Sequence, residues 1–172
     1  MHILIVGPRQ VGKSTLIDKV LKAAGRPVWG FETKKEAAPF DEELGCPIHI
    51  YDAGSPHIQT KDNLVGYCLN HRPTAYPEVF DHFAKKMQTP PEQGSIIKMD
   101  ELGFIESDAK EFCNTILHYL DGDIPVIAAV KNKSTPFLDA VKNHPNCKCF
   151  YISEENRDAL ADEVLEFLIQ QL

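Results

Sequence analysis

The residues best suited to chemistry lie near the amino terminus of the 172-residue chain. Residues 7–14 have the pattern G-x-x-x-x-G-K-S, which is typical of a P-loop that binds phosphate groups. The glycines at both ends of the pattern let such a loop curl with its backbone N–H groups pointing inward. Lys13 would bring a positive charge to the β- and γ-phosphates of a nucleotide, and the Ser14 hydroxyl would bind Mg²⁺. The residues expected to contact the nucleotide here are Gly7, Pro8, Arg9, Gln10, Val11, Gly12, Lys13, Ser14 and Thr15.

The segments on either side of this pattern are those that a P-loop requires. An apolar run at residues 3–6 predicts a strand that ends at the loop, and the pattern of residues 13–24 predicts a helix that follows it. Strand, glycine-containing loop and helix in this order form the context in which the motif binds phosphate. The positive end of that helix would face the phosphates. We expect Lys13 to be exposed and unpaired in the nucleotide-free protein.

A second pair of candidate residues follows another apolar run. Residues 95–100 predict a buried strand that ends in Asp100 and Glu101, with Lys98 as an interruption of its apolar character. In an open α/β sheet, ligands bind outside the carboxyl ends of the strands, so this pair and the P-loop should meet at one edge. Asp100 is then expected to hold Mg²⁺, directly or through water. Glu101 is expected to orient the attacking water or accept its proton.

Alternating apolar runs and helical patterns occupy the rest of the chain. Strands are predicted at residues 2–6, 27–33, 46–51, 95–100, 124–130 and 147–152. Helices are predicted at residues 13–24, 76–87, 106–120, 136–143 and 156–172. A β-hairpin with a long connection is expected to join the second and third strands, and residues 61–70 are ambiguous, with a short helix as the candidate. Continuous apolar strands between helices predict a mostly parallel sheet covered on both faces. We therefore predict an α/β chain with one domain over residues 1–172, a three-layer αβα sandwich with an antiparallel hairpin.

The composition narrows the classes of partner. A formal net charge of −7 gives no electrostatic case for nucleic-acid or anionic-membrane binding, and no apolar stretch is long enough to span a membrane. Five cysteines, an odd number, argue against a disulfide framework, and we expect no signal peptide before the first predicted strand. The histidines and cysteines do not have the spacing of a protein-ligated metal site. We expect a cytoplasmic protein.

Three further segments add to the P-loop pattern. Residues 30–33 have the form Gly-Phe-x-Thr, residues 100–103 are Asp-Glu-Leu-Gly, and residues 155–158 are Glu-Asn-Arg-Asp. Together with residues 7–16, these segments resemble the small P-loop nucleoside-triphosphatases of the THEP type, also called cancer-related nucleoside-triphosphatases. The resemblance implies Mg²⁺-dependent hydrolysis of several nucleoside triphosphates, with slow turnover and loose base specificity.

The chain also departs from that family. Where the family continues from its Gly-Phe-x-Thr into Glu-Val-Arg and a later Arg-x-Gly-Phe, this chain has Lys-Lys-Glu-Ala at residues 34–37 and no arginine until Arg72. The family's Lys-Met-Glu after Gly103 is replaced by Phe-Ile-Glu at residues 104–106. A cationic group at the transferred phosphate contributes about 10³–10⁵ in rate. The sequence therefore supports nucleotide binding more strongly than fast hydrolysis.

Two residues after the last predicted strand are further candidates for the nucleotide site. Arg157 would stack on a base or touch a phosphate, or would instead pair with Glu154 or Asp158 at the start of the helix. Asn156 is a candidate nucleotide contact and also a candidate helix N-cap.

Residues 132–135, Asn-Lys-Ser-Thr, lie where GTPases carry Asn-Lys-x-Asp, but Thr135 replaces the aspartate that would read guanine. No base-reading group is therefore identified in the sequence. The predicted function is hydrolysis of nucleoside triphosphates such as ATP and GTP with weak base discrimination. A small-molecule or nucleoside kinase and a non-catalytic nucleotide-dependent switch remain as alternatives.

Overall fold

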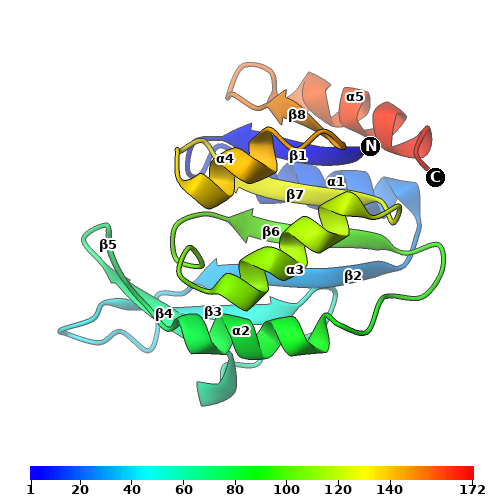
Figure 1. Cartoon of the computed structure of the whole chain (residues 1–172). Helices are drawn as coiled ribbons and strands as arrows, with labels where there is room; N and C mark the ends of the chain where they lie inside the picture. The colour runs from blue at the N-terminus through cyan, green and yellow to red at the C-terminus, as the bar shows by residue number, and fades with distance from the viewer.

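Eight strands form a single sheet in the computed structural model, which describes residues 1–172 (Figure 1). The strands are β1 (His2–Gly7), β2 (Val28–Lys35), β3 (Cys46–Asp52), β4 (Leu64–Leu69), β5 (Arg72–Ala75), β6 (Ile96–Leu102), β7 (Val126–Lys131) and β8 (Cys147–Tyr151). Their order across the sheet is β5-β4-β3-β2-β6-β7-β1-β8. The five strands from β2 to β8 in this order are parallel, and β3, β4 and β5 continue the sheet in antiparallel fashion.

Helices cover both faces of the sheet and confirm the predicted three-layer architecture. The helices are α1 (Lys13–Ala24), α2 (Pro77–Lys86), α3 (Lys110–Asp121), α4 (Pro136–Lys142) and α5 (Arg157–Ile169). Helices α2, α3 and α4 lie in front of the sheet in Figure 1, and α1 and α5 pack against each other behind it. Every residue of β1 is buried between these layers. The apolar pattern of the parallel strands reflects this burial from two sides.

Helix α1 follows from its sequence and directly positions the P-loop. It begins after Gly12, which has a left-handed φ of 107°, and it ends at Gly25, whose φ is 63°. Leu16, Ile17 and Val20 recur at helical spacing and are buried against the sheet. Burial of a side chain of this kind contributes about 1.5–3 kcal/mol, so the apolar side of α1 fixes the helix and the loop before it.

The structure corrects two predicted elements. Residues 61–70 form only one turn of 3₁₀ helix at Lys61–Asn63 and then strand β4, which pairs with β5 as a second hairpin. The turn of this hairpin is made by Asn70 and His71, which both have positive φ, and it lacks the glycine that usually marks such a turn. The predicted helix at 106–120 begins later, at Lys110, because residues 103–109 form a turn of their own.

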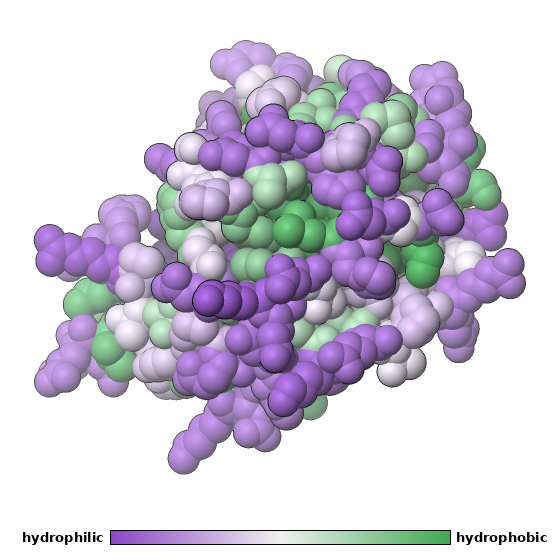
Figure 2. Space-filling model, viewed as in Figure 1, coloured by the Kyte–Doolittle hydropathy of each residue, from purple (hydrophilic) through white to green (hydrophobic).

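The face that carries α2, α3 and α4 is mostly polar, with apolar atoms visible between the helices (Figure 2). None of the helices has both the length and the apolar character needed to cross a bilayer.

Candidate active site

The candidate residues gather at the carboxyl edge of the parallel strands. Strand β7 lies between β1, which leads into the P-loop, and β6, which carries Asp100 and Glu101. In the register of β1 and β7, Gly7 is the partner of Lys131. The predicted meeting of the P-loop with the acidic pair is therefore present, and Lys131 ends the strand that separates them.

The P-loop has the backbone of a phosphate cradle. None of the backbone N–H groups of residues 9–15 donates a hydrogen bond within the protein. Gln10 and Gly12 have φ of 58° and 107°, values that turn successive peptide groups toward the inside of the loop. A Cβ added at Gly7 would lie 2.6 Å from the Ile152 side chain, which explains a glycine at this position. A row of unpaired amides at the start of α1 is suited to bind an anion.

Lys13 is not exposed and unpaired, as the sequence predicted. Its side chain is only 4% exposed, and its Nζ donates to the backbone oxygens of Gly7 at 3.0 Å and Pro8 at 2.6 Å. The same Nζ lies 3.1 Å from Glu101 Oε2. The prediction was wrong because the partners of Lys13 come from β6 and from the curl of the loop itself, which sequence patterns do not place. The protein's own oxygens thus satisfy the ammonium group.

Ser14 and Asp100, the two predicted metal ligands, are in direct contact. The Ser14 hydroxyl donates to Asp100 Oδ1 at 2.9 Å, whereas the buried Oδ2 of Asp100 accepts no hydrogen bond. Burial raises the pKa of Asp100, and the hydrogen bond from Ser14 and the charge of Lys98 act in the opposite direction. A hydroxyl oxygen beside a carboxylate with an unsatisfied buried oxygen suits Mg²⁺, which prefers oxygen ligands. These two residues therefore fit the ion that the sequence predicted.

Lys98 interrupts the apolar run of β6 because its buried ammonium group neutralises three carboxylates, of which Glu32 and Asp100 are buried and Asp18 is exposed. Its ammonium group contacts Glu32 and lies 2.6 Å from Asp18 and 3.8 Å from Asp100. Burial opposes the charged form of Lys98, but these acidic partners outweigh it and raise its pKa. Burial likewise opposes the charge of Glu32, and hydrogen bonds from Lys98 and His57 lower its pKa overall. Sequence reasoning missed this network, although a lone lysine within an apolar strand was its signal.

Glu101 stands between two lysines. Its Oε2 faces Lys13, and its Oε1 lies 3.5 Å from the ammonium group of Lys131. The Glu101 carboxylate is 27% exposed, so water can reach it. A carboxylate with these properties can accept a proton or orient a water molecule.

The structure brings Arg157 to the P-loop but gives it no ion pair. A Cβ added at Gly12 would lie 3.7 Å from Arg157 Cδ, and Arg157 forms no salt bridge with Glu154 or Asp158. The salt bridge at the start of the helix is therefore not formed, and the contact of Arg157 with a base or a phosphate stays a prediction.

Asn156 occupies the N-cap position of α5, but its side chain does not cap the helix. The Asn156 side chain instead accepts from the Ser153 backbone N–H at 2.7 Å and donates to the backbone oxygen of Tyr151 at 2.9 Å. Asn156 thereby shapes the loop from which Arg157 extends.

Arg9 and the Asn-Lys-Ser-Thr segment also have defined local partners. Arg9 Nη1 lies 3.2 Å from Nδ1 of His71, so the turn between β4 and β5 reaches the P-loop. Thr135 caps α4 by accepting from the Leu138 N–H at 3.1 Å, and Ser134 bonds to Asp139 at 2.6 Å. Residues 134–135 thus form a helix start, which accounts for their types without a base-reading role.

Glu106 is a buried acid that sequence reasoning assigned only to a helix. Its carboxylate accepts from the Gly103 N–H and holds the turn that follows Asp100 and Glu101. Burial raises the pKa of Glu106 from 4.5 to about 7.

This buried acid predicts a pH dependence of stability. The raised pKa means that protonated Glu106 contributes to the free energy of unfolding. This contribution is fully present below about pH 4.5 and is lost as the pH rises through about 7. Between pH 5 and pH 8 the wild-type protein should lose about 2–3 kcal/mol more unfolding free energy than Glu106→Gln, whose neutral amide oxygen can still accept from Gly103. Urea unfolding of both proteins at the two pH values measures the difference. If wild type and Glu106→Gln lose the same free energy of unfolding between the two pH values, Glu106 is not a buried, uncharged acid.

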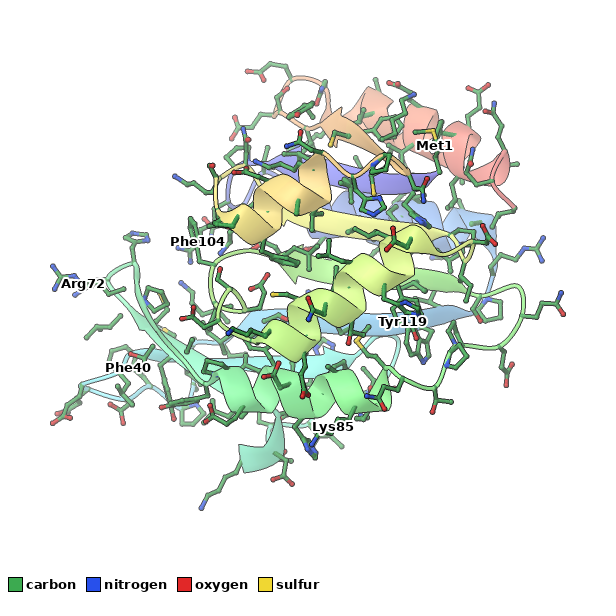
Figure 3. The ribbon with its side chains drawn as sticks, viewed as in Figure 1. Met1, Phe40, Arg72, Lys85, Phe104 and Tyr119 are labelled. Carbon is green, nitrogen blue, oxygen red and sulfur yellow. The ribbon has the colours of Figure 1, made fainter.

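A cavity of about 570 Å³ lies at the opposite edge of the sheet, lined by residues that include Tyr119 and Ile124. Figure 3 shows Tyr119 far from Phe104, which marks the edge with the P-loop. This cavity is therefore distinct from the P-loop.

A mostly parallel sheet with a P-loop after β1 and an acidic pair at the end of β6 defines a P-loop α/β protein. The comparisons with known proteins make the assignment more specific. A family model described as NTPase matches residues 2–165, and the chain belongs to this family. The family also confirms the sequence prediction of a nucleoside-triphosphatase.

Curated relatives match over nearly the whole chain. Nucleoside-triphosphatase THEP1 of Thermotoga maritima is 28% identical over 171 residues, covering 98% of this chain and 95% of the relative. A cancer-related nucleoside-triphosphatase homolog from Bos taurus is 27% identical, covering 95% of this chain and 94% of the relative. The crystal structure of THEP1 from Aquifex aeolicus has a TM-score of 0.70 at 20% identity, covering 98% of this chain and 99% of that chain. These matches confirm the resemblance and the fold expected from the sequence.

Proposed function

We propose that this chain, acting as one domain, hydrolyses nucleoside triphosphates slowly to the diphosphate and phosphate, with Mg²⁺ and broad base specificity. The observation that carries the proposal is the contact between two motifs far apart in the sequence. Lys13 lies 3.1 Å from Glu101, and Ser14 lies 2.9 Å from Asp100. The family of the chain supports the same reaction. The five cysteines are free thiols, which fits the proposed cytoplasmic location.

The residues at the carboxyl ends of the parallel strands would have different roles in hydrolysis. The unpaired amides of residues 9–15 would bind the phosphate oxygens, and Lys13 would exchange its carbonyl partners for the β- and γ-phosphates. Glu101 would orient a water molecule and take its proton as the water oxygen bonds to the γ-phosphorus. The bond between that phosphorus and the bridging oxygen then breaks, and its electron pair stays on the diphosphate.

Ser14 and Asp100 would hold Mg²⁺, which supplies charge neutralisation at the β- and γ-phosphates when bound. Arg157 would lie beside the nucleotide, because its side chain already passes over Gly12. The absence of the family's arginines after Thr33 supports slow turnover, since a cation at the transferred phosphate contributes about 10³–10⁵ in rate.

Identification of the products tests hydrolysis against the two alternatives. Incubation of the protein with MgATP and no acceptor should yield ADP and phosphate in equal amounts. Formation of ADP only after addition of an alcohol or nucleoside would contradict hydrolysis and favour a kinase. Tight binding of ATP without any product would favour a switch.

The protein should discriminate only weakly between the bases of different nucleotides. Specificity requires polar groups that the wrong base leaves unpaired, and the Ser134 and Thr135 side chains are already engaged at the start of α4. Stacking on Arg157 would be available to any base. ATP and GTP should therefore bind within about tenfold of each other, a difference of at most about 1.4 kcal/mol. Competition binding with the two nucleotides is the test, and a hundredfold preference would overturn this prediction.

A further inference from the structure

We propose that Lys131 is a positioning residue that holds Glu101 when Lys13 leaves it for the phosphates of an incoming nucleotide. The proposal rests on the proposed function and adds a residue that belongs to neither sequence motif. In this arrangement the Glu101 carboxylate passes from two lysine partners to one, and nucleotide binding does not leave it without a counter-ion.

The position of Lys131 follows from the sheet. Strand β7 lies between the strand of the P-loop and the strand of the acidic pair, and Lys131 is its last residue. It is the register partner of Gly7, the first residue of the P-loop. Because of this strand order, a side chain at residue 131 can reach both motifs.

The stem of Lys131 is held by the turn after β6. A Cβ added at Gly103 would lie 2.9 Å from Lys131 Cδ, so the aliphatic chain packs directly on this glycine. The ammonium group lies 6.0 Å from the centroid of the Phe104 ring. These contacts direct the charge of Lys131 toward Glu101, which lies in β6 two residues before Gly103.

The two lysines on Glu101 differ in what else they bind. Lys13 has the carbonyl oxygens of Gly7 and Pro8 and is almost fully buried, whereas Lys131 has only Glu101 as an acidic partner and is 33% exposed. A polyphosphate carries more negative charge than a carboxylate, so it should draw Lys13 away from Glu101. Lys131 lowers the cost of that step because Glu101 keeps one ammonium group beside it.

Without Lys131, Glu101 would be left to Lys13 alone and would compete more strongly with the nucleotide for it. Lys131→Met should therefore weaken binding of a non-hydrolysable ATP analogue with Mg²⁺ by about fivefold, the upper end of the range expected for a partly exposed ion pair. Lys131→Arg, which retains the charge, should bind within about threefold of wild type.

A double-mutant cycle with Glu101→Gln distinguishes this role from others, with isothermal titration of the same analogue as the measurement. If Lys131 acts through Glu101, Lys131→Met should change the affinity less than twofold in the Glu101→Gln background. Lys85→Met on α2, which removes an equal charge far from the P-loop edge (Figure 3), should bind like wild type.

Three results would overturn the proposal. Equal weakening in both backgrounds would mean that Lys131 touches the phosphates directly. Wild-type affinity in Lys131→Met would mean that it does nothing for binding, and failure of the arginine to rescue would mean that packing rather than charge matters. Failure of the proposed function looks different, because the wild-type protein itself would then bind no nucleotide or release no phosphate.

Discussion

Replacement of Lys13 by alanine should abolish nucleotide hydrolysis and weaken nucleotide binding by at least about 10²-fold. The ammonium group of Lys13, at the start of α1, can carry charge to the β- and γ-phosphates, and loss of a single donor to developing charge costs about 10²–10³ in rate. The fold should survive. Glu101 would keep Lys131 at 3.5 Å as its counter-ion, so the substitution leaves no isolated buried charge.

Titration calorimetry with MgATP and circular dichroism together measure this result. Lys85→Ala provides the matched control, since Lys85 is exposed on α2 and is labelled below that helix in Figure 3. A Lys13→Ala protein that is folded and binds MgATP like wild type would refute the assignment of residues 7–14 as a phosphate loop.

Replacement of Glu101 by glutamine should lower turnover by about 10²–10⁴ and leave the affinity for MgATP at least at the wild-type level. The amide keeps the shape of the side chain but cannot accept a proton from water. It also competes less than a carboxylate for Lys13, which Glu101 Oε2 approaches at 3.1 Å. Single-turnover phosphate release and binding of a non-hydrolysable analogue separate the two effects.

Asp100→Asn is the matched comparison, because it changes the neighbouring carboxylate in the same way. It should raise the Mg²⁺ concentration needed for half-maximal activity, since Asp100 rather than Glu101 contacts Ser14. If both variants turn over like wild type, the acidic pair at the end of β6 is structural.

Much of the candidate active site could be predicted from the sequence because it depends on short, local sequence patterns. The P-loop spacing, the helix that begins after Gly12 and the apolar run before Asp100 are each contained within a few neighbouring residues. Parallel strands buried on both faces have continuous apolar runs, so the sheet and its two helical layers followed from the same patterns.

The remaining features depend on contacts between distant segments. Strand β5 is an edge strand and is short and largely exposed, so its sequence lacks a strong apolar signal. The apolar run of β4 is short and interrupted by Gly66, and such a run does not separate a strand from a helix by its pattern. Glu101, the acidic partner of Lys13, lies 88 residues away, and Lys98 on β6 contacts Glu32 on β2. Sequence reasoning could mark these lysines as unusual or important, but it could not state what neutralises them.

The central claim is that this edge of the sheet hydrolyses nucleoside triphosphates with Mg²⁺. Phosphate release from ATP, GTP, CTP and UTP, each with and without Mg²⁺, tests it most directly, with Lys13→Ala as the blank for contaminating activity. We expect slow release from all four nucleotides with Mg²⁺ and no release above the blank without it. No release from any of the four, or release that does not depend on Mg²⁺ or on Lys13, would contradict the account.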